Sequence, residues 1–401
     1  YLCGVNIVKL IVYYCELFLQ YASFIISLIS RRKVLSVNKI TGNMEKKMSN
    51  KNVVLIAGVH GISGKSAAEA WLKIPNTKVY GLSRRTAPLP EGVEGIIVDL
   101  LKPEDVKTKV GGLTDVTHLV FGAYIEKQNP AEKSRINVEI LRNLLEVVEE
   151  SSTSLKHVVF FQGTKAYGSD LGPFKTPTRE DDPRLMSPNF YYDQEDYVRQ
   201  QQKGKSWHWT TFRPEAVLGY ATGNPMNLGV AIAVYATISK ELGIPLRFPG
   251  SPEAYRAIYQ VSSAKILANA TVWSASAETA RNEIFNITNG DQFRWMYMWS
   301  KIAKMFDMET AEPVPMSLVE FMADKADLWK NIVEKYNLSD LPYEKVVSWD
   351  FADFIFNSGF DNVSGTIKAR KAGFQDCIDT EEMFQNFFNE LRENKVIPTY
   401  F

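Results

Sequence analysis

The sequence has few of the residues that would place the protein outside the cell or on a nucleic acid. Its three cysteines, Cys3, Cys15 and Cys377, form no paired framework and no zinc spacing, which fits a reducing compartment. We therefore expect a cytoplasmic protein. Four isolated histidines predict no metal cluster. The formal net charge is zero, so no basic field indicates a nucleic-acid partner.

Long uncharged apolar runs are also missing. The longest near the start, Leu17 to Ser30, has 14 residues, whereas a membrane-spanning helix needs about 20. An N-terminal anchor stays open for residues 1–50, because Arg31-Arg32-Lys33 follow this run as a basic flank. We favour an extension that is disordered or absent from the mature protein, since Met44 and Met48 would make natural starts. No other membrane contact is expected.

A glycine-rich turn is the clearest motif that is present. The apolar run Val53–Ala57 predicts a buried parallel strand, and Lys65–Leu72 after the turn has good helix formers. The glycines between them are spaced G-x-x-G-x-x-G. A strand, a glycine turn and a helix form the context of a dinucleotide-binding site, in which the free N–H groups of the helix face the pyrophosphate. The alternative is a tight turn without a ligand, and His60 within the turn could have a packing role instead. The predicted cofactor contacts in this turn are Gly58, His60, Gly61, Ile62 and Gly64.

The end of the second predicted strand indicates which nicotinamide cofactor binds. About 20 residues after the glycines, NAD enzymes place an acid for the ribose 2′-hydroxyl, whereas an arginine there can hold a 2′-phosphate. This chain has Ser83-Arg84-Arg85 at that point, which predicts NADPH/NADP+. Solvated surface arginines are the alternative. At the exits of later strands we predict further cofactor contacts from Asp99, Leu100, Gln162, Gly163, Pro214 and Val217. Asp99 could instead cap the next turn, and Pro214 and Val217 could merely turn the chain.

Strand-like and helical segments alternate after the glycine turn. The strand candidates are Val79–Ser83, Gly95–Val98, His118–Phe121, His157–Gln162 and Trp209–Phe212. The pattern predicts an α/β fold, a Rossmann-type doubly wound parallel sheet with ligands at the carboxyl ends of the strands. Residues 51–225 would form an NADP-binding Rossmann domain. Residues 226–401 would form a smaller, mainly helical substrate-capping lobe, with a strand near 283–288 returning to the sheet.

Two adjacent tyrosines are candidates for the chemistry. Short-chain dehydrogenases pair a tyrosine with a lysine four residues later on the same helix face. Four residues after Tyr191 and Tyr192 this chain has Glu195 and Asp196, which we interpret as solvated helix charges. Lys165, at the exit of the fifth strand, could supply the positive charge from another element. The alternative is a surface lysine with a core tyrosine.

Several segments together carry a resemblance to a known family. The glycine turn, "YGLSRR", "GTKAYG", "NFYYDQED", "FRPEAVLG", "NPMNLG" and "FNITNGDQFRW" follow one another as in the progesterone 5β-reductase/iridoid synthase-like family. The resemblance runs from about Lys51 to Pro398. Members of that family are atypical short-chain dehydrogenases that reduce the C=C bond of enones with NADPH. The resemblance implies that Lys165 and Tyr191 form the catalytic pair. It departs at "GTKAYG", where plant members tend to have Arg-Lys-His-Tyr, and at Glu215, where the family has a glycine.

The resemblance implies an NADPH-dependent reductase that delivers hydride to the β-carbon of a small carbonyl substrate. Its tyrosine would stabilise the enolate. We expect Tyr192, Met226 and Asn227 to contact the substrate, and a homodimer is left open. Two other readings remain: a sugar-nucleotide epimerase or dehydratase, and a non-catalytic NADPH-binding regulator. The meeting in space of Lys165 and Tyr191 separates catalysis from regulation.

Overall fold

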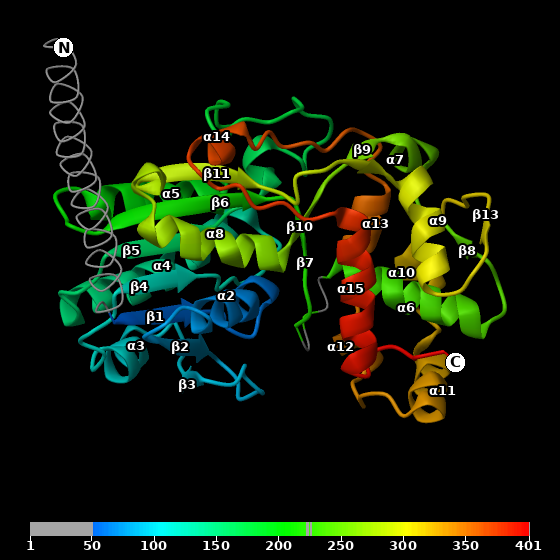
Figure 1. The fold of residues 1–401 in the computed structure, drawn as a ribbon, viewed down its shortest axis with the longest axis horizontal. Helices are drawn as coiled ribbons and strands as arrows, with labels where there is room; N and C mark the ends of the chain where they lie inside the picture. Colours follow the sequence, from blue (N-terminus) through cyan, green and yellow to red (C-terminus); the bar gives the residue numbers. More distant parts are fainter. Residues whose placement is uncertain (1–50, 222–223, 225–226, 401) are drawn as a thin grey trace, which may run out of the picture. The chain divides into compact units, whose positions relative to one another are not determined.

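The fold is built on a seven-stranded sheet in which every strand runs parallel to its neighbours (Figure 1). The computed structural model describes residues 51–221, 224 and 227–400, so the expectations for residues 1–50 and for Met226 lie outside the described residues. Across the sheet the strands are β11 (Glu283–Ile287), β6 (His208–Pro214), β5 (His157–Phe161), β4 (His118–Phe121), β1 (Asn52–Ala57), β2 (Thr77–Ser83) and β3 (Val93–Ile97). The strand order reverses between β1 and β4, which confirms the predicted doubly wound Rossmann-type fold.

Helices cover both faces of the sheet. On one face, α2 (Ile62–Leu72) and α8 (Ala264–Ser276) pack against each other. On the opposite face lie α3 (Pro103–Val110), α4 (Pro130–Ser151) and α5 (Phe190–Gln202). Each layer has its own apolar core. The strands between the layers are therefore shielded from water, as in other parallel sheets.

The local sequence explains where these elements begin and end. In β1, residues 53–57 are at most 1 % exposed, which accounts for an apolar run without alternation. The strand expected at Gly95–Val98 starts earlier, at Val93. α4 begins at Pro130, where Asn129 accepts a hydrogen bond from the Glu132 N–H (3.0 Å) and caps the start of the helix.

The later part of the chain is mainly helical. Its helices are α6 (Leu228–Glu241), α7 (Pro252–Arg256), α9 (Trp295–Met305), α10 (Leu318–Phe321), α11 (Ala326–Tyr336), α12 (Tyr343–Val346), α13 (Trp349–Phe356), α14 (Ile367–Lys371) and α15 (Thr380–Glu393). Short paired strands join them: β7 (Ala216–Leu218) with β10 (Val261–Ser263), β8 (Leu246–Arg247) with β13 (Thr310–Ala311), and β9 (Ile258–Tyr259) with β12 (Phe293–Arg294). The strand expected near 283–288 is β11. The division near residue 225 into a nucleotide-binding domain and a capping lobe stays a proposal.

These helices enclose the largest apolar cluster of the described residues. Trp295 and Trp299 are each 1 % exposed, and their rings lie 6.1 Å apart, edge to face. Both tryptophans, four residues apart on α9, therefore belong to the core. α6 runs through the cluster and is buried on all sides from Leu228 to Ser239, which explains its lack of an amphipathic pattern. No helix within residues 51–221 and 227–400 is long and apolar enough to cross a membrane.

Three of the four histidines lie in a row at the amino-terminal edge of the sheet. His118, His157 and His208 are the first residues of β4, β5 and β6 and stand directly opposite one another. Because neighbouring strands are about 4.8 Å apart, their side chains are adjacent. The sequence reading of isolated histidines was wrong in this respect. In the part of the chain that the structure describes, no group of three or more His, Cys, Asp or Glu side chains is placed to hold a metal ion.

This row predicts a loss of stability in acid. Burial, followed by the nearby charge of Lys156, lowers the pKa of His118 from 6.5 to about 4. Burial, followed by the charges of His118, His208 and Arg281, lowers the pKa of His157 to about 3. Below about pH 6.5, these two imidazoles therefore bind protons in the unfolded chain but stay neutral in the folded chain down to about pH 4. Each of these two histidines should destabilise the fold by about 2 kcal/mol between pH 7.5 and pH 5.

Urea unfolding of the wild type and of His157→Gln at both pH values checks this. The variant should lose about 2 kcal/mol less than the wild type on acidification. Carboxylates affect both proteins equally, so the difference isolates the imidazole. Equal losses in the two proteins would show that the row does not govern acid stability.

Candidate active site

The glycine turn at the end of β1 is built on two close backbone contacts. Gly58 has φ +80°, and a Cβ placed there would lie 2.7 Å from the Gly122 carbonyl oxygen at the exit of β4. A Cβ on Gly64 would lie 2.2 Å from the Gly58 carbonyl oxygen. Larger residues are therefore excluded at both positions by the backbone itself. The first and third glycines let the chain turn tightly and bring α2 against the turn.

The start of α2 fits a phosphate-bearing cofactor. Gly61 is its N-cap residue and offers no side chain, and no described side chain caps the free N–H groups of the first turn. An uncapped helix start of this kind attracts anions through its N–H groups and its dipole. Ile62, also predicted to contact the cofactor, is 8 % exposed and packs with Ala221 and Ala264. Its backbone therefore faces the turn while its side chain fills the layer behind it.

The predicted arginines lie beside this turn. Burial and then the charge of Arg85 lower the pKa of His60, although a hydrogen bond with the Arg85 backbone raises it, so these two residues are neighbours. Ser83 holds the chain after β2 in a turn, since its Oγ accepts from the Arg85 N–H at 3.2 Å. Arg84 and Arg85 are both exposed. Binding of a 2′-phosphate by these two arginines stays a prediction.

Asp99 and Leu100 follow β3 at the same edge of the sheet. Asp99 Oδ1 accepts from the Leu101 N–H (3.1 Å), and Lys102 lies 3.9 Å from Oδ2. The carboxylate therefore stabilises its own turn, which was the alternative reading of this residue. The Leu100 side chain is 7 % exposed and packs in the core. A contact of either residue with the cofactor stays a prediction.

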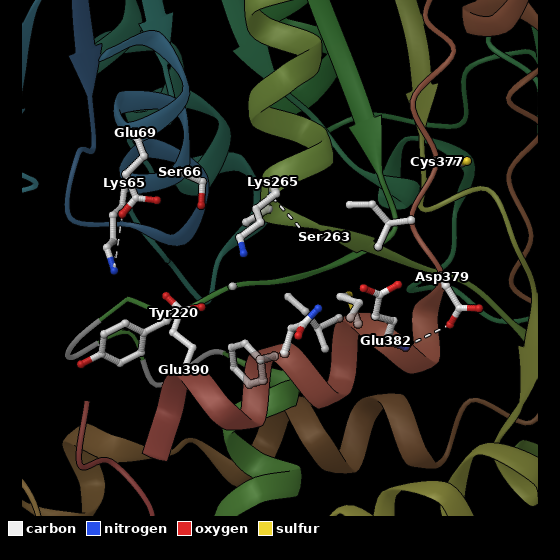
Figure 2. A pocket seen from close by; sticks show the side chains of 17 residues that line it. Lys65, Ser66, Glu69, Tyr220, Ser263, Lys265, Cys377, Asp379, Glu382 and Glu390 are labelled. Carbon is white, nitrogen blue, oxygen red and sulfur yellow. Dashed lines mark hydrogen bonds and ion pairs between the residues drawn. The ribbon is translucent and has the colours of Figure 1, made fainter. Parts of the chain in front are cut away.

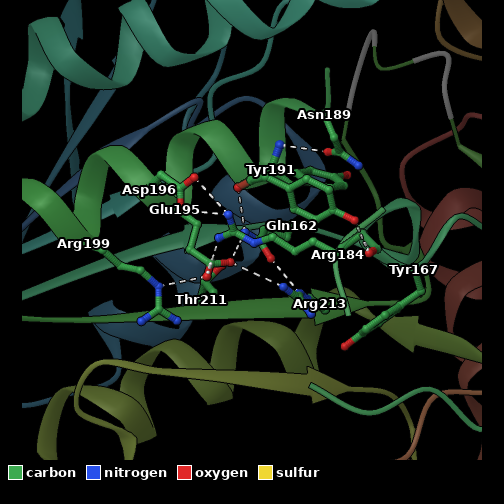
Figure 3. A network of polar contacts seen from close by, with 12 residues as sticks. Gln162, Tyr167, Arg184, Asn189, Tyr191, Glu195, Asp196, Arg199, Thr211 and Arg213 are labelled. Atoms are coloured by element: carbon green, nitrogen blue, oxygen red, sulfur yellow. Dashed lines mark hydrogen bonds and ion pairs between the residues drawn. The ribbon is translucent and has the colours of Figure 1, made fainter. Parts of the chain in front are cut away.

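A buried network fixes the exits of β5 and β6 (Figure 3). Gln162 Nε2 donates to the Tyr191 carbonyl (2.9 Å) and to Glu195 Oε2 (3.1 Å). The Gln162 Oε1 atom accepts from Arg213 Nε (2.7 Å). All the polar atoms of this amide therefore bind protein groups. Its role in the structure is to join β5, β6 and the first turn of α5.

Glu195 is the centre of this network and corrects the sequence reading. It is 2 % exposed, not solvated. Its Oε1 lies 2.9 Å from both Arg184 and Arg199, and its Oε2 lies 3.4 Å from Arg213. Burial alone would raise the pKa of Glu195. The hydrogen bond from the Gln162 side-chain amide and the arginine charges outweigh burial and hold this pKa below its usual range. The position that carries lysine in typical short-chain dehydrogenases is here a buried anion with a structural role.

The Tyr191 hydroxyl lies at the carboxyl ends of two central strands. A Cβ placed on Gly163 would be 3.1 Å from the Tyr191 hydroxyl oxygen and 3.7 Å from the Pro214 carbonyl oxygen. The phenol is therefore close to the exits of both β5 and β6, and only glycine fits at residue 163 without displacing it. Burial, followed by the charges of Asp170 and Glu126, raises the pKa of Tyr191. The phenol keeps its proton at neutral pH.

The two adjacent tyrosines differ in what their hydroxyls do. Tyr192 is 2 % exposed, donates to the Ala166 carbonyl (2.7 Å) and accepts from the Leu185 N–H (3.0 Å). It holds the segment after β5, and the structure does not place it at a surface that a substrate can reach. The Tyr191 hydroxyl, in contrast, has no hydrogen-bond partner among the described residues. Tyr191 is therefore the tyrosine that is free to act on a ligand.

The backbone of Lys165 is linked to that of Tyr191, but the Lys165 ammonium is not hydrogen bonded to the Tyr191 hydroxyl. It lies in η1 (Thr164–Tyr167) and is exposed. Asn189 joins the two elements, because its Nδ2 donates to the Lys165 carbonyl (3.0 Å) and its Oδ1 accepts from the Tyr191 N–H (3.1 Å). Lys165 Nζ lies 6.0 Å from the centre of the Phe354 ring on α13. Within the described residues, no hydrogen bond joins Lys165 Nζ to the Tyr191 hydroxyl.

The remaining predicted residues lie around the start of α6. Pro214 is buried at the end of β6, and Val217, in β7, is half-buried against the layer of α2 and α8. Asn227 is 1 % exposed; its Nδ2 donates to the Gly219 carbonyl (2.7 Å) and its Oδ1 caps α6 at the Val230 N–H (3.3 Å). Both polar atoms of the Asn227 amide therefore bind backbone groups of the fold, and a contact with the substrate stays a prediction.

A cavity of about 340 Å³ lies between α2, α8 and α15 (Figure 2). Lys65 and Glu69 from α2, Lys265 from α8 and Glu390 from α15 line it, together with Gly219. Neither Tyr191 nor Lys165 contributes to its wall. The lining mixes charges of both signs.

The sheet order and the glycine turn are those of the extended short-chain dehydrogenase fold. Residues 98–398 match the PRISE-like Rossmann-fold domain, and the chain belongs to this family. Two relatives cover most of it. An (S)-8-oxocitronellyl enol synthase from Camptotheca acuminata is 34 % identical over 369 residues, which are 86 % of this chain and 93 % of that protein. A 3-oxo-Delta(4,5)-steroid 5-beta-reductase from Arabidopsis thaliana is 33 % identical over 375 residues, 88 % of this chain and 95 % of that protein.

Solved structures share the architecture at low identity. A UDP-glucose 4-epimerase from Thermotoga maritima with UDP-glucose superposes with a TM-score of 0.62 at 16 % identity, covering 85 % of this chain and 99 % of that one. A UDP-glucose 4-epimerase from Thermus thermophilus in complex with NAD gives a TM-score of 0.58 at 17 % identity, with coverages of 85 % and 99 %. These likenesses establish the fold and not the reaction.

Proposed function

We propose that this protein reduces the C=C bond of α,β-unsaturated carbonyl compounds with NADPH. The observation that carries the proposal is the Tyr191 hydroxyl, which lies at the exits of β5 and β6 with no hydrogen-bond partner among the described residues. The relatives support it, because the name of the Arabidopsis protein combines a 3-oxo group with a Delta(4,5) double bond. The epimerase reading loses support, since Glu195 occupies the position of the lysine that such enzymes pair with their tyrosine.

The residues at the turn and at the end of β2 would hold the cofactor. The N–H groups at the start of α2 would bind the diphosphate, and Arg84 and Arg85 the 2′-phosphate. When bound there, NADPH supplies a hydride at the carboxyl edge of the sheet. Gly163 and Pro214 would form the wall beside the nicotinamide.

Negative charge develops on the carbonyl oxygen as the substrate's β-carbon accepts hydride. The Tyr191 hydroxyl would donate a hydrogen bond to that oxygen and stabilise the enolate. Its raised pKa keeps the proton on the phenol for this purpose. The Lys165 ammonium would add positive charge through space, because it does not hydrogen bond to the phenol. Proton delivery to the α-carbon would complete the reduction.

Apolar side chains beside η1 support a substrate with an apolar body. Leu171 and Leu185 converge above Gly168, which directly follows η1. They are 79 % and 42 % exposed. Phe354, which faces Lys165, is 40 % exposed. Exposed apolar groups around one charged group suit a small molecule with a carbonyl at one end.

A substrate panel tests the proposed function. NADPH consumption should be followed with cyclic enones, α,β-unsaturated aldehydes, saturated ketones and UDP-sugars. We expect turnover with the first two groups and a saturated carbonyl as the product. Turnover of UDP-sugars without net NADPH consumption would instead favour the epimerase reading, and NADPH binding without turnover of any compound would favour the regulator.

Cofactor choice gives a separate prediction. Arg84→Ala and Arg85→Ala should each weaken NADPH binding by about 10- to 100-fold, because hydrogen bonds to a charged group contribute about 1.5–3 kcal/mol. NADH binding should change by less than about twofold. Fluorescence titration with both cofactors checks this. Arg135→Ala is the charge-matched control, because Arg135 is an exposed arginine that pairs with Glu139 on α4. An equal loss for NADH and NADPH would remove the arginines from 2′-phosphate recognition.

A further inference from the structure

Glu215 is a buried carboxyl directly behind the candidate site. It lies between Pro214, the last residue of β6, and β7, and is 3 % exposed. Its N–H donates to Ser262 Oγ of β10 (3.0 Å), and Ser262 Oγ in turn donates to the Ile287 carbonyl of β11 (2.7 Å). Its backbone is thus held by the edge of the sheet. In the part of the chain that the structure describes, no cation pairs with its carboxyl group, which makes it unlike Glu195.

The Glu215 side chain holds a second segment of the chain. Ser364 Oγ donates to Glu215 Oε1 at 2.6 Å, and the Ser364 N–H donates to Gln260 Oε1 at 2.8 Å. Residues 362–365, which we call the strap, form the link between Glu215 and a distant loop. Thr178 Oγ1 donates to Ser364 Oγ (3.0 Å), and the backbones of Thr178 and Ser364 form a parallel bridge. The bridge uses two hydrogen bonds of 2.9 Å, from the Thr178 N–H to the Val363 carbonyl and from the Gly365 N–H to the Thr178 carbonyl.

The loop held in this way borders the catalytic tyrosine. Residues 168–189, which we call the active-site loop, connect η1 with α5. Asp170 in this loop acts electrostatically on the Tyr191 phenol. Near its end, Arg184 pairs with Glu195. Its middle is anchored at Thr178, which is 1 % exposed. The chain of contacts from Glu215 through Ser364 to Thr178 is therefore one anchor of the middle of the loop, beside the hydrogen bonds that Asn286 of β11 makes to Thr178 and Glu180.

We propose that Glu215 is a positioning residue that fixes the active-site loop beside Tyr191 by way of Ser364 and Thr178. This proposal rests on the proposed function for its effect on catalysis, but not for its effect on the loop. Glu215 itself touches no reacting atom. It sets the position of Asp170 and of the apolar side chains Leu171 and Leu185 in the active-site loop. Glu215 therefore governs substrate affinity more than the chemical step.

The surroundings of the carboxyl make this anchor sensitive to pH. Burial raises the pKa of Glu215 to about 7, although hydrogen bonds with Ser364 and Asn362 lower it. The titratable group that faces it is the Tyr259 phenol on β9, whose own pKa is raised first by burial and then by the charge of Glu215. Oε2 has no partner among the described residues. Ionisation above pH 7 leaves a charge without a cation in this cluster and favours arrangements in which the strap opens to water.

Three variants test the proposal. Glu215→Gln keeps the shape of the side chain and its acceptor for Ser364 but does not titrate. Glu215→Gly introduces the residue of the related family and removes the anchor, and Ser364→Ala removes the hydroxyl that links Glu215 to Thr178. Ser339→Ala, whose hydroxyl donates to the Asn394 carbonyl at the surface (3.1 Å), is the matched control. Each protein is measured with NADPH bound, at pH 6.5 and pH 8.5.

The first measurement is amide hydrogen exchange in the active-site loop and the strap, corrected for the intrinsic effect of pH. Glu215→Gly and Ser364→Ala should lose about tenfold in protection at Thr178 and Gly365, the loss expected for one buried hydrogen bond. The wild type should lose protection between pH 6.5 and pH 8.5, and Glu215→Gln should not. The same loss in Glu215→Gln as in the wild type, or unchanged protection in Ser364→Ala, would overturn the proposal.

The second measurement is steady-state kinetics with an enone. KM for the enone should rise about tenfold in Ser364→Ala and in Glu215→Gly, with kcat and the Kd of NADPH within about twofold of the wild type. The wild-type KM should rise above pH 7, and that of Glu215→Gln should stay level. If the wild type turns over no enone, the proposed function fails while the exchange experiment still decides the role of Glu215. If Glu215→Gly does not fold, Ser364→Ala and Glu215→Gln decide it.

Discussion

Replacement of Tyr191 by phenylalanine is expected to lower kcat for enone reduction by about 100- to 1000-fold, because the variant lacks the hydrogen-bond donor for the developing enolate. The Tyr191 hydroxyl has no partner among the described residues, so its removal breaks no contact of the fold. The free energy of unfolding should therefore change by less than about 1 kcal/mol. NADPH affinity should stay within about twofold. Single-turnover kinetics measures the loss of reaction rate, and NADPH titration measures the affinity for the cofactor.

The same helix offers a control for this substitution. Tyr197 lies on α5, and its hydroxyl makes only a 3.5 Å contact to Glu146. Tyr197→Phe should leave kcat close to that of the wild type. Near-normal turnover in Tyr191→Phe, or an equal loss in Tyr197→Phe, would remove Tyr191 from its proposed role.

The second large effect concerns stability. Glu195→Ala should lower the free energy of unfolding by about 3–5 kcal/mol, because it leaves the Arg213 guanidinium, 3 % exposed, without its buried anion. Gln162 Nε2 also loses one of its two acceptors and keeps only the Tyr191 carbonyl. Urea unfolding at pH 7.5 measures the loss.

Asp196, the next residue, is the matched control. It is 61 % exposed on its side chain and pairs with the same Arg184. Asp196→Ala should cost at most about 1 kcal/mol, as is usual for exposed ion pairs. Similar costs for the two substitutions would mean that the Glu195 network contributes no more than a surface pair.

The sheet and the cofactor turn could be predicted because their signals are local. A continuous apolar run predicted β1, and the glycines that follow it are required by contacts within a few residues or at the neighbouring strand exit. The resemblance, together with their places at a helix start and a strand exit, made Tyr191 and Lys165 the candidate pair, and their catalytic roles stay a prediction. The expected strand of residues 283–288 returned to the sheet as β11.

The roles that sequence reasoning missed depend on contacts between distant residues. Glu195 was read as solvated because the arginines that bury it, at positions 184, 199 and 213, come from a loop, the same helix and another strand. Asn227 was expected at the substrate, but its amide caps α6 and holds Gly219. The histidine row arises from strand register, which the sequence does not specify. One usable signal was present: His118 and His157 begin their predicted strands, and His208 directly precedes the predicted strand Trp209–Phe212.

The central claim is that hydride reaches the β-carbon of an enone at this site, and NADPH deuterated at nicotinamide C4 tests it most directly. After incubation with a cyclic enone and the wild-type protein, NMR of the product should show one deuterium at the β-carbon and an intact carbonyl group. Tyr191→Phe should give the same product at about one hundredth of the rate or less. Deuterium at the carbonyl carbon, or no transfer to any enone, would contradict the account.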